Sequence, residues 1–231
     1  MKSTRFVGLL FCAAGVIASE NAWSQVSGSV SVVSDYRFRG VSLSDGQAEP
    51  QATVAYDSPA GWYAGVFGSG VKLREGRDQQ LIAYAGYSQR QASGLTWEVG
   101  ATNSSFMQTS GSNYAEAFVG LSFDEYSGRL YLSPNYFGQS TTTAYLELNA
   151  SHLVAEQTSL IAHVGYLRWF SGSQSSAFVP VSRMDTLIGI STSWSDWRVQ
   201  LAWIATARNK VRSPIYDHNS STLMLSGSYS F

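Results

Sequence analysis

The chain ends on Thr222-Leu223-Met224-Leu225-Ser226-Gly227-Ser228-Tyr229-Ser230-Phe231, and this stretch decides the fold. Successive side chains of a β-strand point to opposite faces of the strand. One face of this segment therefore carries apolar and aromatic side chains, and the other carries mostly small and polar ones. Two kinds of structure use such a strand: a soluble β-domain with its apolar face inward, and a membrane barrel with its apolar face in lipid.

The chain terminus favours the membrane barrel. Phe231 is the last residue, and Tyr229 lies on the same face two residues before it. This ending resembles the C-terminal assembly signal of bacterial outer-membrane barrels. Tyr229 and Phe231 are therefore the residues expected to be recognised by the barrel-assembly machinery.

Composition narrows the class further. The chain has 231 residues, a net charge of −1 and only 13% charged residues, whereas about 25% is usual for soluble domains. The near-neutral balance argues against nucleic-acid binding. One cysteine cannot form an intrachain disulfide, and no apolar run reaches the roughly 20 residues of a membrane-spanning helix.

Alternation of the same kind recurs along the chain. It predicts an all-β, antiparallel transmembrane barrel of about twelve strands, with ten or fourteen as alternatives because the segments 61–71 and 128–138 alternate weakly. The expected strands are 25–39, 48–57, 61–71, 79–90, 94–105, 112–124, 128–138, 142–151, 158–170, 183–194, 197–208 and 220–231. In the first of them the residues expected to face lipid are Val26, Val30, Val32, Tyr36 and Phe38.

The connections between these segments alternate in length, with longer ones at 40–47, 72–78, 103–111, 171–182 and 209–219. Outer-membrane barrels have short periplasmic turns and longer outer loops. An even strand number then places both termini in the periplasm, and the protein in the bacterial outer membrane. Lipid and lipopolysaccharide are its expected surroundings.

The N-terminus has the pattern of a signal peptide. Lys2 and Arg5 precede an apolar run, Phe6 to Ala18, that is too short to span a membrane as a helix. Small residues at Ala22 and Ser24 predict cleavage between Ser24 and Gln25. The expected organisation is a signal peptide over 1–24 and a barrel over 25–231.

Two stretches carry a family resemblance. One is Ser34-Asp35-Tyr36-Arg37-Phe38-Arg39-Gly40-Val41-Ser42, and the other is Ala83-Tyr84-Ala85-Gly86-Tyr87-Ser88. They resemble the TorF-family porins of proteobacteria, a conserved family of unknown function. The resemblance implies an outer-membrane barrel that acts as a channel, and it implies no substrate.

Charged residues of the barrel segments fall mainly on the polar face, which is the expected lumen face. Lumen residues tune selectivity in such barrels, so these residues are the candidates for selecting solutes. An interior salt-bridge network that fills a small barrel is the equal alternative. The candidates are Asp35, Arg37, Arg39, Glu49, Glu98, Glu116, Arg129, Glu147, Asp185 and Arg198.

Charge is also divided along the expected barrel axis. The outer end holds Arg37, Arg39, Lys72, Arg74, Arg77, Arg168, Arg183, Arg208, Lys210 and Arg212. The periplasmic end is expected to hold Asp57, Glu98, Glu116, Asp124, Glu125, Glu147, Glu156 and Asp196. A basic mouth predicts a preference for anionic solutes, although arginines that contact lipopolysaccharide phosphate from outside would give the same pattern.

Catalysis has little support in the sequence. His218 and Ser220 share a face, but no third residue that would orient them is identifiable. Three scattered histidines without a second cysteine argue against a structural zinc site. The expected function is a porin-like channel for small polar solutes, without cofactor, metal or nucleic acid. A closed barrel that binds lipid or a partner through its loops is the alternative, and a lipid-modifying enzyme is less favoured.

Overall fold

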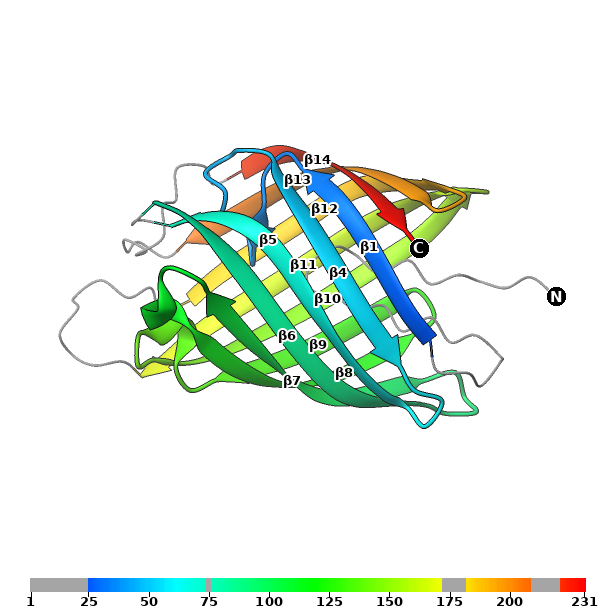
Figure 1. Ribbon diagram of the computed structural model, residues 1–231. Coiled ribbons are helices and arrows are strands. Elements are labelled where there is room, and N and C mark those ends of the chain that lie inside the picture. Colours follow the sequence, from blue (N-terminus) through cyan, green and yellow to red (C-terminus); the bar gives the residue numbers. More distant parts are fainter. Residues whose placement is uncertain (1–24, 74–75, 172–181, 209–220) are drawn as a thin grey trace.

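The fold is a closed antiparallel β-barrel of twelve strands (Figure 1). The computed structural model describes residues 25–73, 76–171, 182–208 and 221–231. Each strand pairs with its sequence neighbour, and β1 closes the ring by pairing with β14. The wall consists of β1 (Gln25–Val33), β4 (Glu49–Asp57), β5 (Trp62–Leu73), β6 (Gly76–Arg90), β7 (Thr96–Phe106), β8 (Tyr114–Phe123), β9 (Tyr126–Ser133), β10 (Thr142–Ala155), β11 (Thr158–Ser171), β12 (Ser182–Trp194), β13 (Trp197–Arg208) and β14 (Ser221–Ser230).

The period-two pattern produces two different faces of this wall. In β14, Leu223 and Leu225 are exposed on the outside, whereas Met224 and Ser226 are buried on the inside. The same alternation runs through β8, where every second residue from Tyr114 to Gly120 is buried. The outward face is thus apolar, as a lipid-facing surface requires. Among the described residues, no helix is long and apolar enough to cross a membrane.

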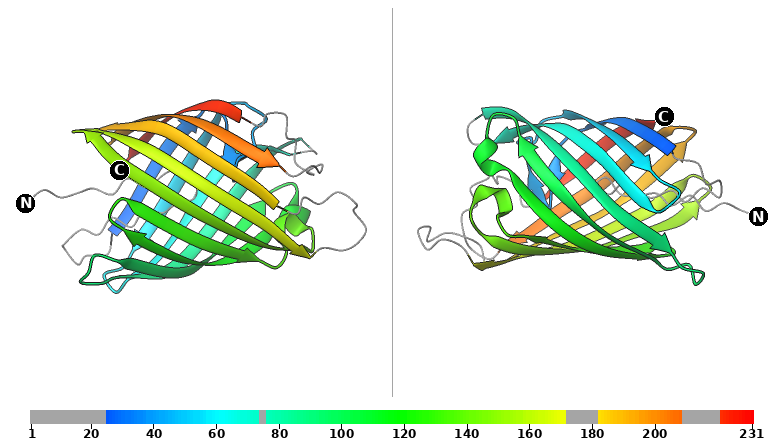
Figure 2. Two further views of the ribbon diagram at one scale, coloured as in Figure 1. Left: turned by 180° about the vertical axis from the view of Figure 1, so that it is seen from behind. Right: turned by 60° about the horizontal axis from the view of Figure 1, so that its bottom comes forward.

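The two ends of the barrel differ. Short turns join the strands at the end where Gln25 and Phe231 lie, and the longer connections that the structure describes, 34–48, 107–113 and 134–141, lie at the opposite end (Figures 1 and 2). We call them the turn end and the loop end. A belt of aromatic pairs surrounds the turn end, with ring centroids 5.2 Å apart for Trp62 and Tyr87 and 5.0 Å apart for Trp197 and Tyr229.

The barrel closes through the C-terminal residues. Tyr229 pairs with Val30 across the β1–β14 ladder. Phe231 continues this pairing, because its N–H donates to the Gly28 carbonyl and the Gly28 N–H donates to its carbonyl, both at 2.9 Å. The Phe231 ring covers Gly28 so closely that a Cβ there would lie 2.6 Å from the ring. Phe231 is thus a structural part of the seam.

The strand predicted over 25–39 ends at Val33, so the prediction is wrong for residues 34–39. The chain leaves the wall at Ser34 and folds inward as a hairpin of β2 (Arg37–Phe38) and β3 (Val41–Ser42). Tyr36 and Phe38 are therefore buried inside the barrel and do not face lipid. Alternation predicted a longer strand because a hairpin strand and a wall strand have the same period of two.

Two other boundaries also differ from the expectation. The connection predicted over 72–78 is short, because β5 continues to Leu73 and β6 begins at Gly76. The strand predicted over 128–138 ends at Ser133, directly before Pro134, which has no N–H for a ladder hydrogen bond. After it the chain makes a short 3-10 turn, η2 (Tyr136–Gly138), and the loop after β7 contains another, η1 (Ser110–Ser112).

Candidate functional site: the lumen and its inward hairpin

The inward hairpin is built by a tight turn. Phe38 pairs with Val41, so Arg39 and Gly40 form a two-residue connection. Both have positive φ, 50° for Arg39 and 78° for Gly40, which is the signature of a type I′ turn. Gly40 also meets the opposite wall, since a Cβ there would collide with Thr206 and lie 2.5 Å from the Asp185 Cβ.

Asp35 organises the hairpin internally. Its carboxylate accepts hydrogen bonds from Arg37 Nε at 2.6 Å, Ser42 Oγ at 2.5 Å and Ser44 Oγ at 3.2 Å. The Tyr36 N–H donates to Ser44 Oγ at 2.8 Å. These contacts satisfy a buried carboxylate and join both sides of the hairpin. They give a structural reason for the motif Ser34–Ser44.

The hairpin reaches across the lumen to several strands. Thr206 Oγ1 of β13 donates to the Gly40 carbonyl at 2.8 Å. The Tyr36 hydroxyl donates to Gln80 Oε1 of β6 at 2.9 Å. The Lys72 N–H of β5 donates to the Leu43 carbonyl at 2.6 Å. Contacts to distant strands place the hairpin inside the barrel at its loop end.

Arg39 at the hairpin tip makes the strongest contact with the wall. Its two terminal nitrogens donate to the two carboxylate oxygens of Glu116 on β8, at 2.9 and 2.7 Å. The guanidinium carbon lies 4.2 Å from the ring centroid of Tyr145 and 5.1 Å from that of Tyr131. Tyr136 of η2, in the connection after β9, adds a third ring at 5.4 Å. Bidentate pairing and cation–π contact together fix the guanidinium.

Apolar and aromatic side chains fill most of the remaining loop-end half. One buried cluster joins the hairpin to strands β5 to β11 and η2, including Tyr36, Phe67, Phe106, Phe137 and Tyr145. A second, smaller cluster lies on β11 to β14. Phe137 stacks on Tyr114 with ring centroids 4.8 Å apart. The interior of this half is thus packed like a protein core.

The turn-end half of the lumen is different. Its inward residues are mostly small or polar. On β11 to β14 several of them are buried, such as Ser159, Ser191, Gln200 and Ser228. Those that keep partial solvent exposure include Ser27, Ser29, Ser31, Thr53, Ser127, Asn149, Ser151, Ser193 and Arg198.

The structure pairs most of the predicted lumen charges. The hairpin holds Asp35 with Arg37 and presents Arg39 to Glu116. Nearer the turn end Arg129 pairs with Glu98 at 2.5 Å, and at the loop end Glu49 pairs with Arg77 at 3.3 Å. Asp185 contacts His163 at 2.9 Å. Within the described part of the chain, Glu147 and Arg198 face inward without an ion-pair partner.

These ion pairs bear on whether the lumen charges select solutes or form a salt-bridge network that fills the barrel. An interior ion-pair network is present, and the role of these residues in selectivity stays a prediction. Glu116 is also not at the turn end, where the sequence placed it, because it is the third residue of β8 after a loop-end connection. The residues His218, Ser220 and Ser24 lie outside the described residues.

Sequence reasoning missed the aromatic residues that hold Arg39. Tyr131 and Tyr145 lie on the inward parity of their strands, and this parity is the signal that could have identified them. Tyr136 had no such signal, because it was placed on a strand that ends before it. Burial raises the pKa of the Tyr136 phenol, which keeps it neutral beside the guanidinium.

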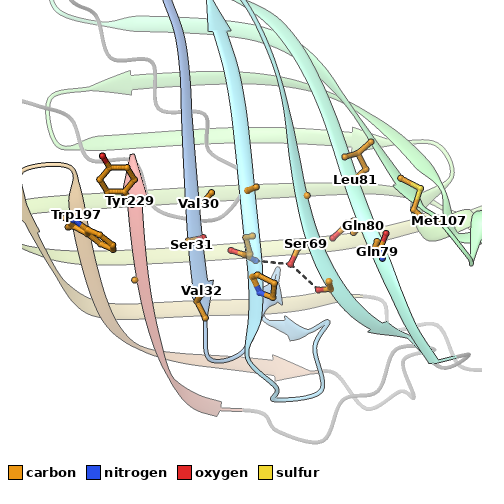
Figure 3. Close-up of a pocket in the computed structure, with 16 residues that line it drawn as sticks. Val30, Ser31, Val32, Ser69, Gln79, Gln80, Leu81, Met107, Trp197 and Tyr229 are labelled. Atoms are coloured by element: carbon orange, nitrogen blue, oxygen red, sulfur yellow. Dashed lines mark hydrogen bonds between the residues drawn. The ribbon is translucent and has the colours of Figure 1, made fainter. Parts of the chain in front are cut away.

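One depression on the described surface lies outside the lumen. It is a groove of about 650 Å³ on the outward face of β14, β1, β4, β5 and β6 (Figure 3). Small residues such as Ala52 and Gly68 leave room between Val30, Leu81 and Trp197. The groove is apolar and open to the outside of the barrel.

Solved structures show the same fold. The NanC porin aligns with a TM-score of 0.60 at 10% identity, over 89% of this chain and 98% of that chain. The KdgM porin aligns with a TM-score of 0.55 at 11% identity, over 90% and 99%. The Pseudomonas putida toluene transporter TodX aligns with a TM-score of 0.50 at 12% identity, over 92% and 90%. The fold is therefore that of outer-membrane porin barrels.

Sequence comparison gives the family. No curated protein matches the chain. The sequence predicted a bacterial family of unknown function with a barrel fold, and this part of the prediction is supported. The family name TorF stays a prediction. The matching family model is described as "Bacterial protein of unknown function (Gcw_chp)" and covers residues 18–228, so the chain belongs to this family.

Proposed function

We propose that this protein is an outer-membrane channel through which small polar solutes diffuse passively. The observation that carries the proposal is the polar inner face of the turn-end half, where residues such as Ser29, Thr53 and Asn149 are only partly buried. A barrel that only needed a filled interior would gain more from apolar side chains there. Orienting the turn end toward the periplasm puts both termini in that compartment.

The similar barrels support a channel in general terms. NanC and KdgM are porins, KdgM has been solved in complex with disordered oligogalacturonate, and TodX is a toluene transporter. These proteins carry different solutes on one fold, so the fold supports passage and leaves the solute open. The loop-end half must then open, because the hairpin β2–β3 fills it.

The proposal predicts that a barrel without the hairpin conducts ions. Val33 and Glu49 already face each other in the β1–β4 ladder. Residues 34–48 can therefore be replaced by Asn-Gly, which forms the two-residue turn that joins adjacent antiparallel strands. We expect stable unitary steps from this variant in a planar bilayer, and smaller or rarer steps from the complete barrel.

A matched pair of substitutions tests whether the current passes through the lumen. In the shortened barrel, Ser29→Trp adds a large side chain to the inner face, and Val30→Trp adds it to the outer face of the same strand. The first should reduce conductance and the second should not. A shortened barrel that is folded, as shown by heat-modifiable gel mobility, yet silent would contradict the channel and favour the alternative of a closed interaction barrel.

Anion preference is the finer part of the proposal. Ion pairs offset several basic residues of the loop end, including Lys72 with Asp45 and Arg77 with Glu49. The inward cations without a carboxylate partner, counting described residues only, are Arg183 and Arg198. They support a positive potential beside these two side chains, which the inward carboxylates Asp185 and Glu147 partly offset. A reversal potential in a salt gradient measures the preference, and cation selectivity would contradict it.

A further inference from the structure

Arg39 lies in a cage whose carboxylate and three of its aromatic rings come from the barrel wall and from η2, while the hairpin itself adds the Phe38 ring at 4.9 Å. Glu116 comes from β8, Tyr131 from β9 and Tyr145 from β10, and Tyr136 comes from the turn that follows β9. Arg39 is the cation that this cage encloses. A carboxylate that accepts a fork of two N–H donors, surrounded by aromatic faces, recognises a guanidinium group.

The wall strands hold this cage independently of the hairpin. Glu116, Tyr131 and Tyr145 belong to strands with continuous ladders on both sides, for example Tyr131 with Phe118 and with Tyr145. Their side chains are almost completely buried. Without Arg39, the Glu116 carboxylate would be a buried charge without a cation, which is strongly unfavourable. The empty cage would therefore take up a soluble cation of the same shape.

The hairpin makes several hydrogen bonds within its own segment. The Asp35 carboxylate accepts hydrogen bonds from the side chains of Arg37, Ser42 and Ser44. These hydrogen bonds of the hairpin do not involve the cage residues. Arg39 is the side chain that projects from its tip to the wall carboxylate. The hairpin thus resembles a tethered ligand whose binding group is one guanidinium.

We propose that the cage of Glu116, Tyr131, Tyr136 and Tyr145 is a guanidinium-binding site and that Arg39 occupies it as a tethered ligand that holds the hairpin in the lumen. A soluble alkylguanidinium competes with Arg39 for the cage. Tethering gives the side chain an effective concentration in the roughly millimolar range, so the competitor acts at millimolar concentrations or above. The proposal rests on the proposed function only for its effect on conductance.

Hairpin docking can be followed by cysteine labelling. The sequence has one cysteine, Cys12, so protein refolded from residue 25 onward has none. Val41 of β3 is 1% exposed, and Val41→Cys places a thiol where a maleimide reaches it only when the hairpin leaves the wall. Refolded barrels carrying this reporter are compared by labelling rate, after heat-modifiable gel mobility has shown that they are folded.

In the reporter background, Arg39→Ala should raise the labelling rate by at least about tenfold, because bidentate and cation–π contacts are both lost. Glu116→Gln should do the same. Arg90→Ala is the control, since it removes an exposed charge at the turn end of β6, away from the hairpin, and it should leave the rate unchanged. Equal rates in the reporter and in its Arg39→Ala variant would overturn the proposal.

Competition identifies the ligand class. Millimolar ethylguanidinium should raise the labelling rate of the reporter barrel, because it displaces Arg39 from the cage, whereas neutral ethylurea should not. It should leave the rate of the Arg39→Ala variant unchanged, because the hairpin of that variant is already released. Equal effects of ethylguanidinium and ethylurea would overturn the binding site.

Conductance separates this proposal from the proposed function. If labelling shows that the hairpin is released in Arg39→Ala and the barrel stays silent in a bilayer, the channel fails and the cage stands. If the labelling rate does not change while the shortened barrel conducts, the channel stands and the cage fails.

Discussion

At the residue scale, Gly40 is the position where the hairpin depends most on one residue. It needs a positive φ for the turn, and it touches Thr206 and Asp185 on the far wall. Gly46, after the hairpin, also has a positive φ, of 71°, but a Cβ added there would meet nothing within 4 Å. Substitution of Gly46 therefore tests backbone strain alone, and substitution of Gly40 tests backbone strain together with steric collision.

Alanine substitution should reveal this difference. Gly46→Ala should cost about 1 kcal/mol of folding free energy, the penalty for a left-handed conformation. Gly40→Ala should cost a further amount of about 1–3 kcal/mol, the range for overpacking a closed interior. Denaturant unfolding of both variants in the same detergent measures the two costs. Equal losses would contradict the wall contact of Gly40.

At the element scale, one side chain anchors the connection between β7 and β8. Asp78 of β6 accepts hydrogen bonds from the backbone N–H groups of Gln108 and Thr109, both at 2.9 Å. The connection also leads into η1, and Asn113 accepts a hydrogen bond from the Phe106 N–H at 2.7 Å. The connection between β7 and β8 is thus attached to β6 through the Asp78 carboxylate.

Asp78→Ala should release this loop while the wall stays intact. Hydrogen bonds to charged groups contribute about 1.5–3 kcal/mol, so the amides of Gln108 and Thr109 should exchange with solvent at least about tenfold faster. Hydrogen exchange resolved by residue measures the change. Asp124→Ala, at an exposed turn of the opposite end, is the control and should leave these amides unaffected.

At the scale of the whole molecule, the wall sorts side chains by face. Leucine and valine side chains are exposed to the outside along the strands, and mid-strand charges such as Arg129 and Glu147 lie inside. This sorting follows from the cost of placing charge in lipid. The bilayer therefore limits which side chains the outward face can carry.

Arginine scanning on one outward strand tests the sorting. Leu201→Arg, near the middle of β13, should cost about 2–4 kcal/mol of folding free energy in a lipid bilayer. Ala207→Arg, on the same face near the loop end of β13, should cost about 0–1 kcal/mol. Reversible denaturant titration in vesicles gives both values. A larger cost at Ala207 would place the apolar band elsewhere on the barrel.

The local alternation of apolar and polar residues was enough to predict most strands of the barrel wall. The alternation from Leu223 to Phe231 predicted the last strand, and Trp197 to Arg208 was predicted with the observed bounds. The inward positions of Glu98, Glu116 and Arg129 followed from parity alone. Their partners did not, because pairing of side chains depends on the register between strands, and many registers satisfy the same alternation.

The sequence by itself determined the class of the fold, because lipid on one side of a wall imposes a period of two that is visible along the chain. Only the tertiary structure decided that Tyr36 and Phe38 leave the wall and that Arg39 enters a cage of Glu116 and Tyr145. Those residues are distant along the chain. The physical reason is that a closed barrel brings opposite walls together, and packing between them selects among segments that share one local pattern.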